Sequence, residues 1–399
     1  MQIPISISSI ASISALGTSQ NEVWQSYAHW RPLFTKKTFK TETSLINSIS
    51  NSREVWVSEI TREGQKELQK LQRSKSAFRK LDRTVLLAIL AGKKAFNPSN
   101  FGNKNIGINL GSSRGATGLF ETYHEDFLKG DGVSAYTSPT TTLGNISSWV
   151  GQELGINGVQ IGHSVTCSTS LHSLLNGIAW LQADMADAFL VGGSEAALTP
   201  FTLAQMKALK LYSNSGNVLS CESMRFQKKK NTMVLGEASA VAVLEKGVSE
   251  RTLAVVTGIG YASEKIAHNS SISDNALCFQ KSMRMALEKA SLKTVDVVIM
   301  HAPGTVKGDN AEYNAIKGVF ENELPLLTSN KWLVGHTFGA SGMLSVEMGV
   351  LMLKHNQFIE NPFFSNQRHL PTKLKNILIN AVGFGGNAVS ILISLPSFE

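Results

Sequence analysis

Cysteine is scarce in this chain, whose 399 residues include three, Cys167, Cys221 and Cys278. The count is odd and the three positions do not cluster, so the sequence gives no support for a disulfide framework or a zinc site. Free thiols are typical of a reducing compartment, and we expect a cytoplasmic protein without a bound metal.

The chain also lacks the features of a membrane or secreted protein. Residues 1–17, MQIPISISSIASISALG, are apolar but contain no basic residue, whereas a secretory signal begins with positive charge. No apolar run is long enough to cross a bilayer. We expect the N-terminal run to form a first strand.

Charged residues make up only 17% of the chain and hydrophobic residues 42%, which is typical of a globular protein with a large buried fraction. Short apolar runs alternate with helix-like stretches, and this alternation predicts an α/β fold with parallel strands between helices. The runs that predict strands are 105–113, 188–198, 238–245, 295–304 and 377–394.

These runs form a weak internal repeat. Each half has a strand, a turn of small polar residues into a long helix, and then a pair of strands around glycines. The halves meet near residue 250, which predicts an N-terminal half, 1–250, and a C-terminal half, 251–399.

The net charge of +8 suits an acidic partner. Arg62, Lys66, Lys70 and Arg73 are spaced to share one face of a helix. This face is either simply solvated or a docking surface, and the pattern alone leaves both open. No aromatic residues are interleaved with the basic ones, so we do not expect nucleic-acid binding.

Cys167 lies in VTCSTSLHSLLN, where small hydroxyl residues precede a helix-like run. Backbone N–H groups and the positive end of the dipole at a helix start both favour a thiolate, the nucleophilic form of cysteine. The same N–H groups can hold a developing oxyanion. The alternative is a buried structural cysteine.

Two of the nine histidines follow strand-like or turn-like segments where catalytic groups gather. His301 follows the apolar run VDVVIM, and His336 lies in LVGHTFGASG at a predicted helix start, the position corresponding to Cys167 in the other half. Glu312 and Lys331 are close to them in sequence, and a buried pair of these two could orient the histidines, although their spacing also fits an ordinary surface pair.

These segments resemble, in order and over nearly the whole chain, the β-ketoacyl–acyl carrier protein synthases, the elongating condensing enzymes of the thiolase superfamily. The matching segments include FRKLDRTVLLAILAGKKAF, GSSRGATG, VTCSTSLHSLLNGIAWL, AFLVGGSEAAL, HAPGTVKGDNAE, SNKWLVGHTFGASG and GFGGNA. The resemblance implies a five-layer αβαβα thiolase-like fold of two duplicated halves, and a dimer.

The resemblance also implies a role for each matching residue. Cys167 would be the acyl-accepting nucleophile, His301 and His336 would promote decarboxylation of a malonyl group, and Lys331 and Glu312 would form a supporting pair. Phe384 would gate the site, its N–H and that of Cys167 would form the oxyanion hole, and Thr305 would contact the pantetheine arm. That arm arrives on an acidic acyl carrier protein, for which the Arg62, Lys66, Lys70 and Arg73 face is the candidate dock, and no other cofactor is implied.

Three departures from the family pattern bear on the substrate. Pro303 replaces a threonine that contacts pantetheine, and Lys229 and Asn231 replace aspartates of a salt-bridged loop. Arg114 replaces an apolar residue near the acyl pocket, where a long saturated tail would meet a charge. We therefore favour a specialised product, such as a polyene or aryl polyene, over housekeeping fatty-acid synthesis.

Other condensing enzymes fit less well. A degradative thiolase needs a second cysteine in the last glycine loop, here GFGGNA, and initiating synthases have asparagine in place of His336. The main alternative is a non-catalytic partner subunit, like the chain-length factors of synthase heterodimers, which generally lack the nucleophilic cysteine. The sequence leaves open a homodimer or a heterodimer with a related chain.

Overall fold

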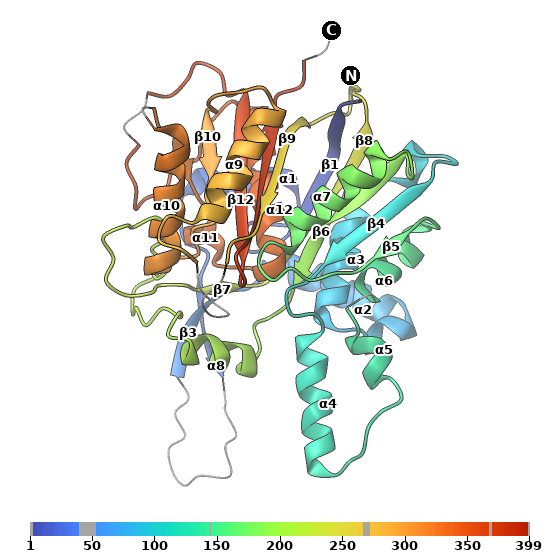
Figure 1. The fold of residues 1–399 in the computed structure, drawn as a ribbon. Helices are drawn as coiled ribbons and strands as arrows, with labels where there is room; N and C mark the ends of the chain where they lie inside the picture. Colours follow the sequence, from blue (N-terminus) through green and yellow to red (C-terminus); the bar gives the residue numbers. More distant parts are fainter. Residues whose placement is uncertain are drawn as a thin grey trace.

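The chain is described from a computed structural model that covers residues 3–39, 53–143, 145–265, 272–321, 323–366 and 369–397 (Figure 1). Its main feature is a mixed sheet of ten strands. In chain order these are β1 (Ile5–Ile13), β4 (Ile106–Gly111), β5 (Gln160–Ile161), β6 (Ala188–Glu195), β8 (Ala238–Lys246), β9 (Ala254–Ala262), β10 (Val297–Ile299), β11 (Leu326–Thr328), β12 (Asn376–Gly383) and β13 (Asn387–Ser394).

The two ends of this sheet repeat one strand order. The first half runs β5-β4-β6-β8-β1 and the second runs β11-β10-β12-β13-β9. In each half the first two neighbouring pairs are parallel and the next two are antiparallel. β1 and β9 also pair with each other, with Ile5 opposite Val256, and this pairing joins the strands of the two halves into one sheet.

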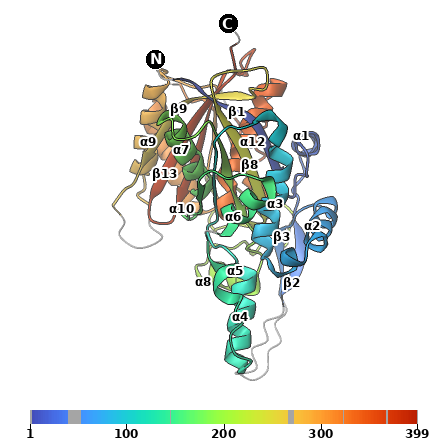
Figure 2. The ribbon, with the colours of Figure 1, turned by 90° about the vertical axis from the view of Figure 1, so that its right-hand side faces the viewer.

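Helices complete five layers, as the resemblance implies. Two helices lie between the halves of the sheet, two cover the outer face of the first half, and two cover the outer face of the second (Figures 1 and 2). These pairs are, respectively, α7 (Thr169–Gln182) with α12 (Ser341–His355), α3 (Arg83–Ala95) with α6 (Asn145–Leu154), and α9 (Leu277–Lys289) with α10 (Val306–Phe320).

The central position of α12 follows from its sequence, SGMLSVEMGVLMLKH, which is apolar on nearly every side. A helix of this kind is stable only when it is covered all round. Its residues from Ser341 to Leu353 are all buried, and each large apolar side chain contributes roughly 1.5–3 kcal/mol by leaving water.

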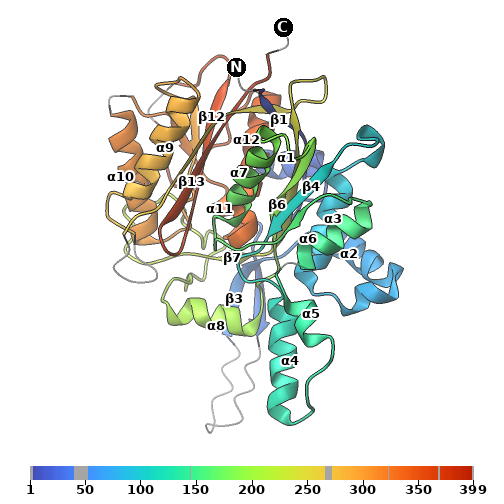
Figure 3. The ribbon, with the colours of Figure 1, turned by 45° about the vertical axis from the view of Figure 1, so that its right-hand side comes forward.

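Smaller elements surround one end of the sheet. A three-stranded sheet and α8 lie below it in Figure 1, and the α4–α5 hairpin extends away from the body in Figures 1 and 3. The bounds are β2 (Thr35–Phe39), β3 (Arg53–Ser58), β7 (Leu235–Gly236), α1 (Gln20–His29), α2 (Arg62–Ser74), α4 (Thr117–Lys129), α5 (Thr137–Thr141), α8 (Pro200–Ala208) and α11 (Lys331–Val334).

Every run that predicts a strand contains one, although β10 is much shorter than 295–304. The predicted boundary at residue 250 falls between β8 and β9, the strands at which the first half ends and the second begins. No helix among the ranges given above is long and apolar enough to cross a membrane.

Candidate active site

Cys167 stands directly before α7, where the sequence places it, and is 6% exposed. Thr169 shapes the turn, because its hydroxyl accepts a 2.9 Å hydrogen bond from the Val165 N–H and donates a 2.6 Å bond to the Thr166 carbonyl. Thr166 has a φ of +49°, which is unusual for a β-branched residue. Such strain is typical of a functional site.

The turn between β12 and β13 packs against the turn before Cys167. Gly383 allows this contact, because a Cβ there would lie 1.9 Å from Thr166 Oγ1 and 2.6 Å from the Val165 carbonyl oxygen. The next residue, Phe384, is 41% exposed. The contact brings Phe384 to the side of the site where the resemblance expects a gate and half of an oxyanion hole.

His301 follows β10, and Glu312 of α10 holds the backbone of its loop. The Glu312 carboxylate accepts 2.9 Å hydrogen bonds from the N–H groups of His301 and Ala302, and a 3.2 Å bond from Asn380 Nδ2. Ala302 has a φ of +25°. Glu312 therefore fixes the loop that presents His301, rather than the imidazole ring.

His336 lies beside His301, with ring centroids 5.2 Å apart and planes at 87°. His336 lies between α11 and α12, two residues before a helical segment, as the sequence predicts. A 3-10 turn, Phe338–Ala340, begins this segment and runs directly into α12 at Ser341. The N–H of His336 donates a 2.7 Å bond to the Val234 carbonyl, which fixes the backbone before the 3-10 turn.

Lys331 and Glu312 are both buried, but the structure does not join them directly. Lys331 Nζ donates a 3.2 Å hydrogen bond to Asn330 Oδ1. Lys331 and Glu312, both within the described residues, form no ion pair with each other. The backbone N–H groups of the His301 loop already occupy the Glu312 carboxylate. Burial lowers the pKa of Lys331 to about 8, and the charge on Glu312 opposes that change.

Burial also sets the protonation of the other groups. It raises the pKa of the Cys167 thiol to about 12, and the charge on Glu195 raises it as well, so burial opposes the thiolate that a helix start favours. Burial lowers the pKa of His336 to about 3 and that of His301 well below its usual value. At neutral pH the site holds a thiol and two neutral imidazoles.

These groups meet at one cavity of about 270 Å³. Apolar side chains such as Met206 and Met233 form much of its wall. The predicted site residues that line it are Cys167, His301, Thr305, Glu312, His336 and Phe384. Across the residues that the structure describes, no three histidine, cysteine, aspartate or glutamate side chains are arranged to hold a metal ion.

Arg114 does not line the cavity, because the Phe338 side chain lies between them. Its guanidinium contacts Gln205 Oε1 and lies 5.9 Å from the ring centre of Phe338, and it is Phe338 that lines the cavity. Arg114 Nε is buried and has no hydrogen-bond partner. Thr305 does reach the cavity wall, and its hydroxyl caps α10 by accepting a 3.2 Å bond from the Gly308 N–H.

The sequence analysis missed Glu195 at the end of β6. This buried carboxylate accepts hydrogen bonds of 2.8–3.2 Å from Ser112 Oγ, Ser113 N–H and Arg114 N–H, and one of 3.0 Å from Gly339 N–H. It therefore joins the loop after β4 to the turn after His336. A single acidic residue in the apolar run AFLVGGSEAAL was the available signal.

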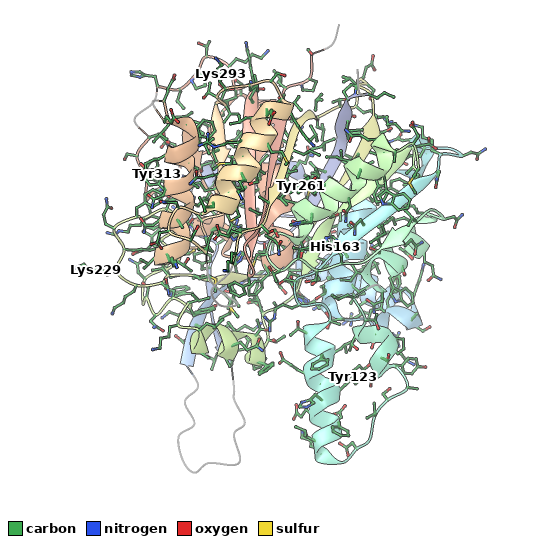
Figure 4. The ribbon with its side chains drawn as sticks, viewed as in Figure 1. Tyr123, His163, Lys229, Tyr261, Lys293 and Tyr313 are labelled. Atoms are coloured by element: carbon green, nitrogen blue, oxygen red, sulfur yellow. The ribbon has the colours of Figure 1, made fainter. Side chains whose placement is uncertain are left out.

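The predicted docking residues Arg62, Lys66, Lys70 and Arg73 are all exposed on α2. Lys66 forms a 3.2 Å ion pair with Glu63 of the same helix. None of these four residues lines the cavity, and α2 lies on the opposite side of the molecule from the labelled Lys229 (Figures 1 and 4).

A second basic surface adjoins the cavity and was missed. It is a pocket of about 990 Å³ that shares Asn231 and Lys307 with the cavity wall. We call it the lysine pocket; its lysines are Lys36, Lys207, Lys210, Lys229, Lys230 and Lys307. The run KKK at 228–230 was the sequence signal, but its first member is not part of the pocket, because Lys228 is buried in a 2.6 Å ion pair with Asp309.

Comparison with solved structures identifies the fold. Solved structures of similar fold include "The ishigamide ketosynthase/chain length factor", with a TM-score of 0.83, 19% identity and full coverage of both chains. Another is a ketosynthase (ApeO) in complex with its chain length factor (ApeC) from Xenorhabdus doucetiae, with a TM-score of 0.80, 19% identity and coverage of 99% of this chain and 98% of that one. These likenesses define the class of fold as thiolase-like.

The family follows from the sequence matches. The model of the β-ketoacyl synthase N-terminal domain matches residues 2–249, and that of the C-terminal domain matches residues 253–364. The 3-oxoacyl-[acyl-carrier-protein] synthase 2 of Vibrio cholerae is 27% identical over 348 residues, which is 80% of this chain and 84% of that protein. This chain belongs to the β-ketoacyl synthase family of condensing acyltransferases.

Proposed function

We propose that this chain is a β-ketoacyl–acyl carrier protein synthase, which condenses a cysteine-bound acyl group with malonyl carrier protein. The observation that supports this most directly is that Cys167, His301 and His336 line one cavity. Its relatives' names support the substrate class, since the Vibrio cholerae protein is a 3-oxoacyl-[acyl-carrier-protein] synthase.

The first half-reaction transfers the acyl group. The Cys167 sulfur attacks the thioester carbonyl of an acyl carrier, and the new oxyanion forms near the N–H groups of Cys167 and Phe384. Because burial keeps Cys167 protonated, its proton must leave during the attack, and a neutral imidazole that lines the same cavity has an unprotonated ring nitrogen that can accept it. The proton ends on the carrier sulfur, which leaves as a thiol.

The second half-reaction uses the histidines as donors. A malonyl carrier enters, its C–CO2 bond breaks, and the electron pair forms an enolate on the thioester. A neutral imidazole has one N–H, so His301 and His336 can each donate a hydrogen bond to the enolate oxygen. The enolate carbon attacks the acyl carbonyl, the C–S bond breaks, and the Cys167 thiolate that leaves takes up a proton from solvent.

Intact mass spectrometry tests the proposal. We expect an acyl adduct on the chain after incubation with a panel of acyl carrier proteins. Cys167→Ala should abolish the adduct, while Cys278→Ala, which changes a buried cysteine of α9, should retain it. An adduct that persists in Cys167→Ala would contradict the proposal.

The second candidate is a non-catalytic partner subunit. Its support is the likeness to structures whose titles name a chain length factor. A chain that takes no acyl group from any carrier, and releases no CO2 from malonyl carrier, would favour this candidate.

The proposed partners are the acyl carrier protein and a second synthase chain. The carrier is acidic, so the predicted dock is the α2 face, and the lysine pocket beside the cavity is the alternative dock; the carrier brings the phosphopantetheine, the one prosthetic group that the reaction needs. The second chain, either another copy or a related synthase, would cover the α4–α5 hairpin, which exposes Phe120, Phe127, Leu128, Val133 and Tyr136. We place the protein in the cytoplasm, and light scattering should show a dimer.

For the acyl chain, we propose a conjugated polyene. The Arg114 guanidinium over Phe338 borders the cavity wall, and a guanidinium is attracted to a π-system but not to a saturated tail. We therefore propose that the product is a polyketide-type polyene or an aryl polyene rather than a housekeeping fatty acid. The adduct masses in the experiment above decide between these substrates.

A further inference from the structure

A shared wall separates the active-site cavity from the lysine pocket. Three segments of the chain build this wall, and each contributes residues to both hollows: 206–212, 229–233 and 303–308. Apolar residues of these segments, such as Leu211 and Met233, line the cavity, whereas neighbouring lysines line the pocket. Asn231 and Lys307 line both. A long, narrow ligand that crosses this wall would therefore occupy both hollows at once.

Asn231 ties the three segments together. Its Oδ1 accepts a 2.8 Å hydrogen bond from the Val306 N–H, and its Nδ2 donates a 3.0 Å bond to the Lys210 carbonyl oxygen. An aspartate, which the resemblance expects at this position, has no N–H to donate, so it would leave the Lys210 carbonyl without this donor. The departure from the family pattern thus holds the segments that carry Lys210 and Lys307 next to each other.

The lysine pocket carries positive charge that the described chain does not balance. All six of its lysines are exposed, and the one carboxylate in its described wall belongs to Glu54, which lies 3.5 Å from Lys36. Three of the others form no ion pair with any residue that the structure describes: Lys210, Lys229 and Lys230. Like charges gathered around one hollow repel one another, so the pocket favours a ligand with several negative charges.

The shape of the pocket favours a small molecule. Its volume of about 990 Å³ suits a ligand the size of a nucleotide, and a folded carrier protein is too large to enter it. Trp56 lines the same pocket, where its Nε1 donates a 3.0 Å hydrogen bond to the Ser215 carbonyl, and an aromatic ring beside lysines can bind a base with its phosphates. The arm of a carrier brings one phosphate, whereas a nucleotide joined to phosphopantetheine brings several. A nucleotide thioester therefore matches the charge of the pocket better.

We propose that the lysine pocket binds the nucleotide phosphates of a soluble acyl thioester of the coenzyme A type, whose pantetheine arm crosses the wall at Asn231 into the cavity. The inference rests on the proposed function, which makes Cys167 the acyl acceptor. In the transfer, the thioester C–S bond breaks, a new C–S bond to Cys167 forms, and the Cys167 proton ends on the released coenzyme A thiol. The chain is then loaded without a carrier protein, and the α2 face remains the dock for the malonyl carrier.

Titration calorimetry at physiological ionic strength tests the pocket. Coenzyme A should bind the wild type about tenfold more tightly than phosphopantetheine does, because phosphopantetheine lacks the nucleotide phosphates. The pocket variant, Lys229→Glu with Lys230→Glu, reverses two charges and should weaken the binding of coenzyme A about tenfold. The matched control is the α2 variant, Lys66→Glu with Lys70→Glu, which reverses two exposed charges elsewhere and should leave this binding unchanged.

Loading of Cys167 decides between the nucleotide thioester and the carrier as the occupant of the pocket. Intact mass should show an acyl adduct from acyl-coenzyme A as well as from an acyl carrier protein. The pocket variant should lose loading from acyl-coenzyme A but keep loading from the carrier, and the α2 variant should do the reverse. Equal binding of coenzyme A by the wild type and the pocket variant would overturn the inference. A pocket variant that loses only loading from the carrier would also overturn it, because the pocket would then be the carrier's dock.

A probe without an acyl group separates this failure from failure of the proposed function. ADP has a base and a diphosphate but no thioester, so its binding does not depend on the chemistry of Cys167. If no thioester acylates Cys167, the proposed function fails, but ADP that binds the wild type and not the pocket variant would still support the nucleotide site. A wild type that binds neither ADP nor coenzyme A would contradict the inference, whether or not a carrier loads Cys167.

Discussion

In each half of the fold, a different buried carboxylate holds the loop that follows an equivalent strand. β4 and β10 occupy equivalent places in the two sets of strands, and a buried glutamate holds the loop after each. Glu312 holds the loop that presents His301, and Glu195 holds the loop that contains Arg114. The same frame thus presents a catalytic candidate in one half and, in the other, a loop whose Arg114 lies over Phe338 of the cavity wall.

The difference lies in where each glutamate comes from. Glu312 lies on the helix that follows its own loop, so it serves the second half alone. Glu195 comes from the neighbouring strand β6 and also accepts from Gly339 of the second half. A Cβ at Gly339 would lie 2.6 Å from Ser113 N and 2.9 Å from Glu195 Oε2, so the two halves meet there backbone to backbone. The His301 loop is therefore held from within its own half, whereas the loop after β4 is joined through Glu195 to the other half.

Glu312→Ala should have the largest effect and should fall on one half-reaction. Two buried N–H groups lose their acceptor, which costs about 1–3 kcal/mol each, and the His301 loop shifts. Loss of one oxyanion donor reduces rate by about 10²–10³, so CO2 release from malonyl carrier should fall by that order. Acylation of Cys167, followed by intact mass, should change little; an equal loss in both assays would remove the distinction between the loops.

Glu195→Ala should show the reverse bias. The loop after β4 and the Gly339 turn both lose their common acceptor, so Phe338 of the cavity wall, next to Gly339, is held less firmly. We expect the rate of Cys167 acylation to fall about tenfold, equivalent to about 1.4 kcal/mol, and CO2 release to fall less. Single-turnover acylation measured beside CO2 release decides this, and a variant impaired only in CO2 release would contradict it.

Arg114→Ala should have a smaller effect, confined to substrate choice. The guanidinium lies over Phe338 of the cavity wall, and such a contact contributes about 0.5–1 kcal/mol at an exposed site, so a less firmly held ring should lower the preference for a polyene acyl carrier a few-fold while long saturated carriers gain. Competition between the two carriers, read from adduct masses, measures the ratio. Equal use of long saturated chains by the wild type and the variant would argue against this role for Arg114.

Glu347→Gln should give the smallest effect, on stability. Burial raises the pKa of Glu347 from 4.5 to about 7, so its protonated form stabilises the fold below pH 4.5, and that stability is lost as pH rises through 7. Unlike Glu195 and Glu312, it accepts no hydrogen bonds in the described chain, so a neutral amide should be harmless. We expect a melting temperature about 2 °C higher than the wild type at pH 8 and none of this gain at pH 4.5.

Thermal denaturation at the two pH values measures the difference. The same Gln substitution at Glu312 is the comparison, because it replaces a carboxylate that accepts backbone bonds and should destabilise the chain at both values. A wild type more stable than Glu347→Gln at pH 8 would show that the charged carboxylate has a partner.

Features that depend on residues close together in the sequence could be predicted from the sequence. Glycines flanking apolar runs predict the β12–β13 hairpin, the spacing of Arg62 to Arg73 predicts α2, and small hydroxyl residues predict the start of α7 just after Cys167. What the sequence could not give depends on long-range contact. Glu195 accepts a hydrogen bond from Gly339, 144 positions away. Lys331 bonds to Asn330, because backbone N–H groups of the His301 loop occupy the Glu312 carboxylate.

The pairing of β1 has a consequence for how the chain is made. Ile5 lies opposite Lys246 in β8 and Val256 in β9, so β1 leaves the ribosome long before its neighbours and has both partners only after about 250 further residues. At about 5–20 residues per second, that strand waits roughly 10–50 s with its isoleucines exposed. Soluble yield in cells should therefore depend on the pace of translation and on chaperones that shield a waiting strand, rather than on the stability of the finished molecule.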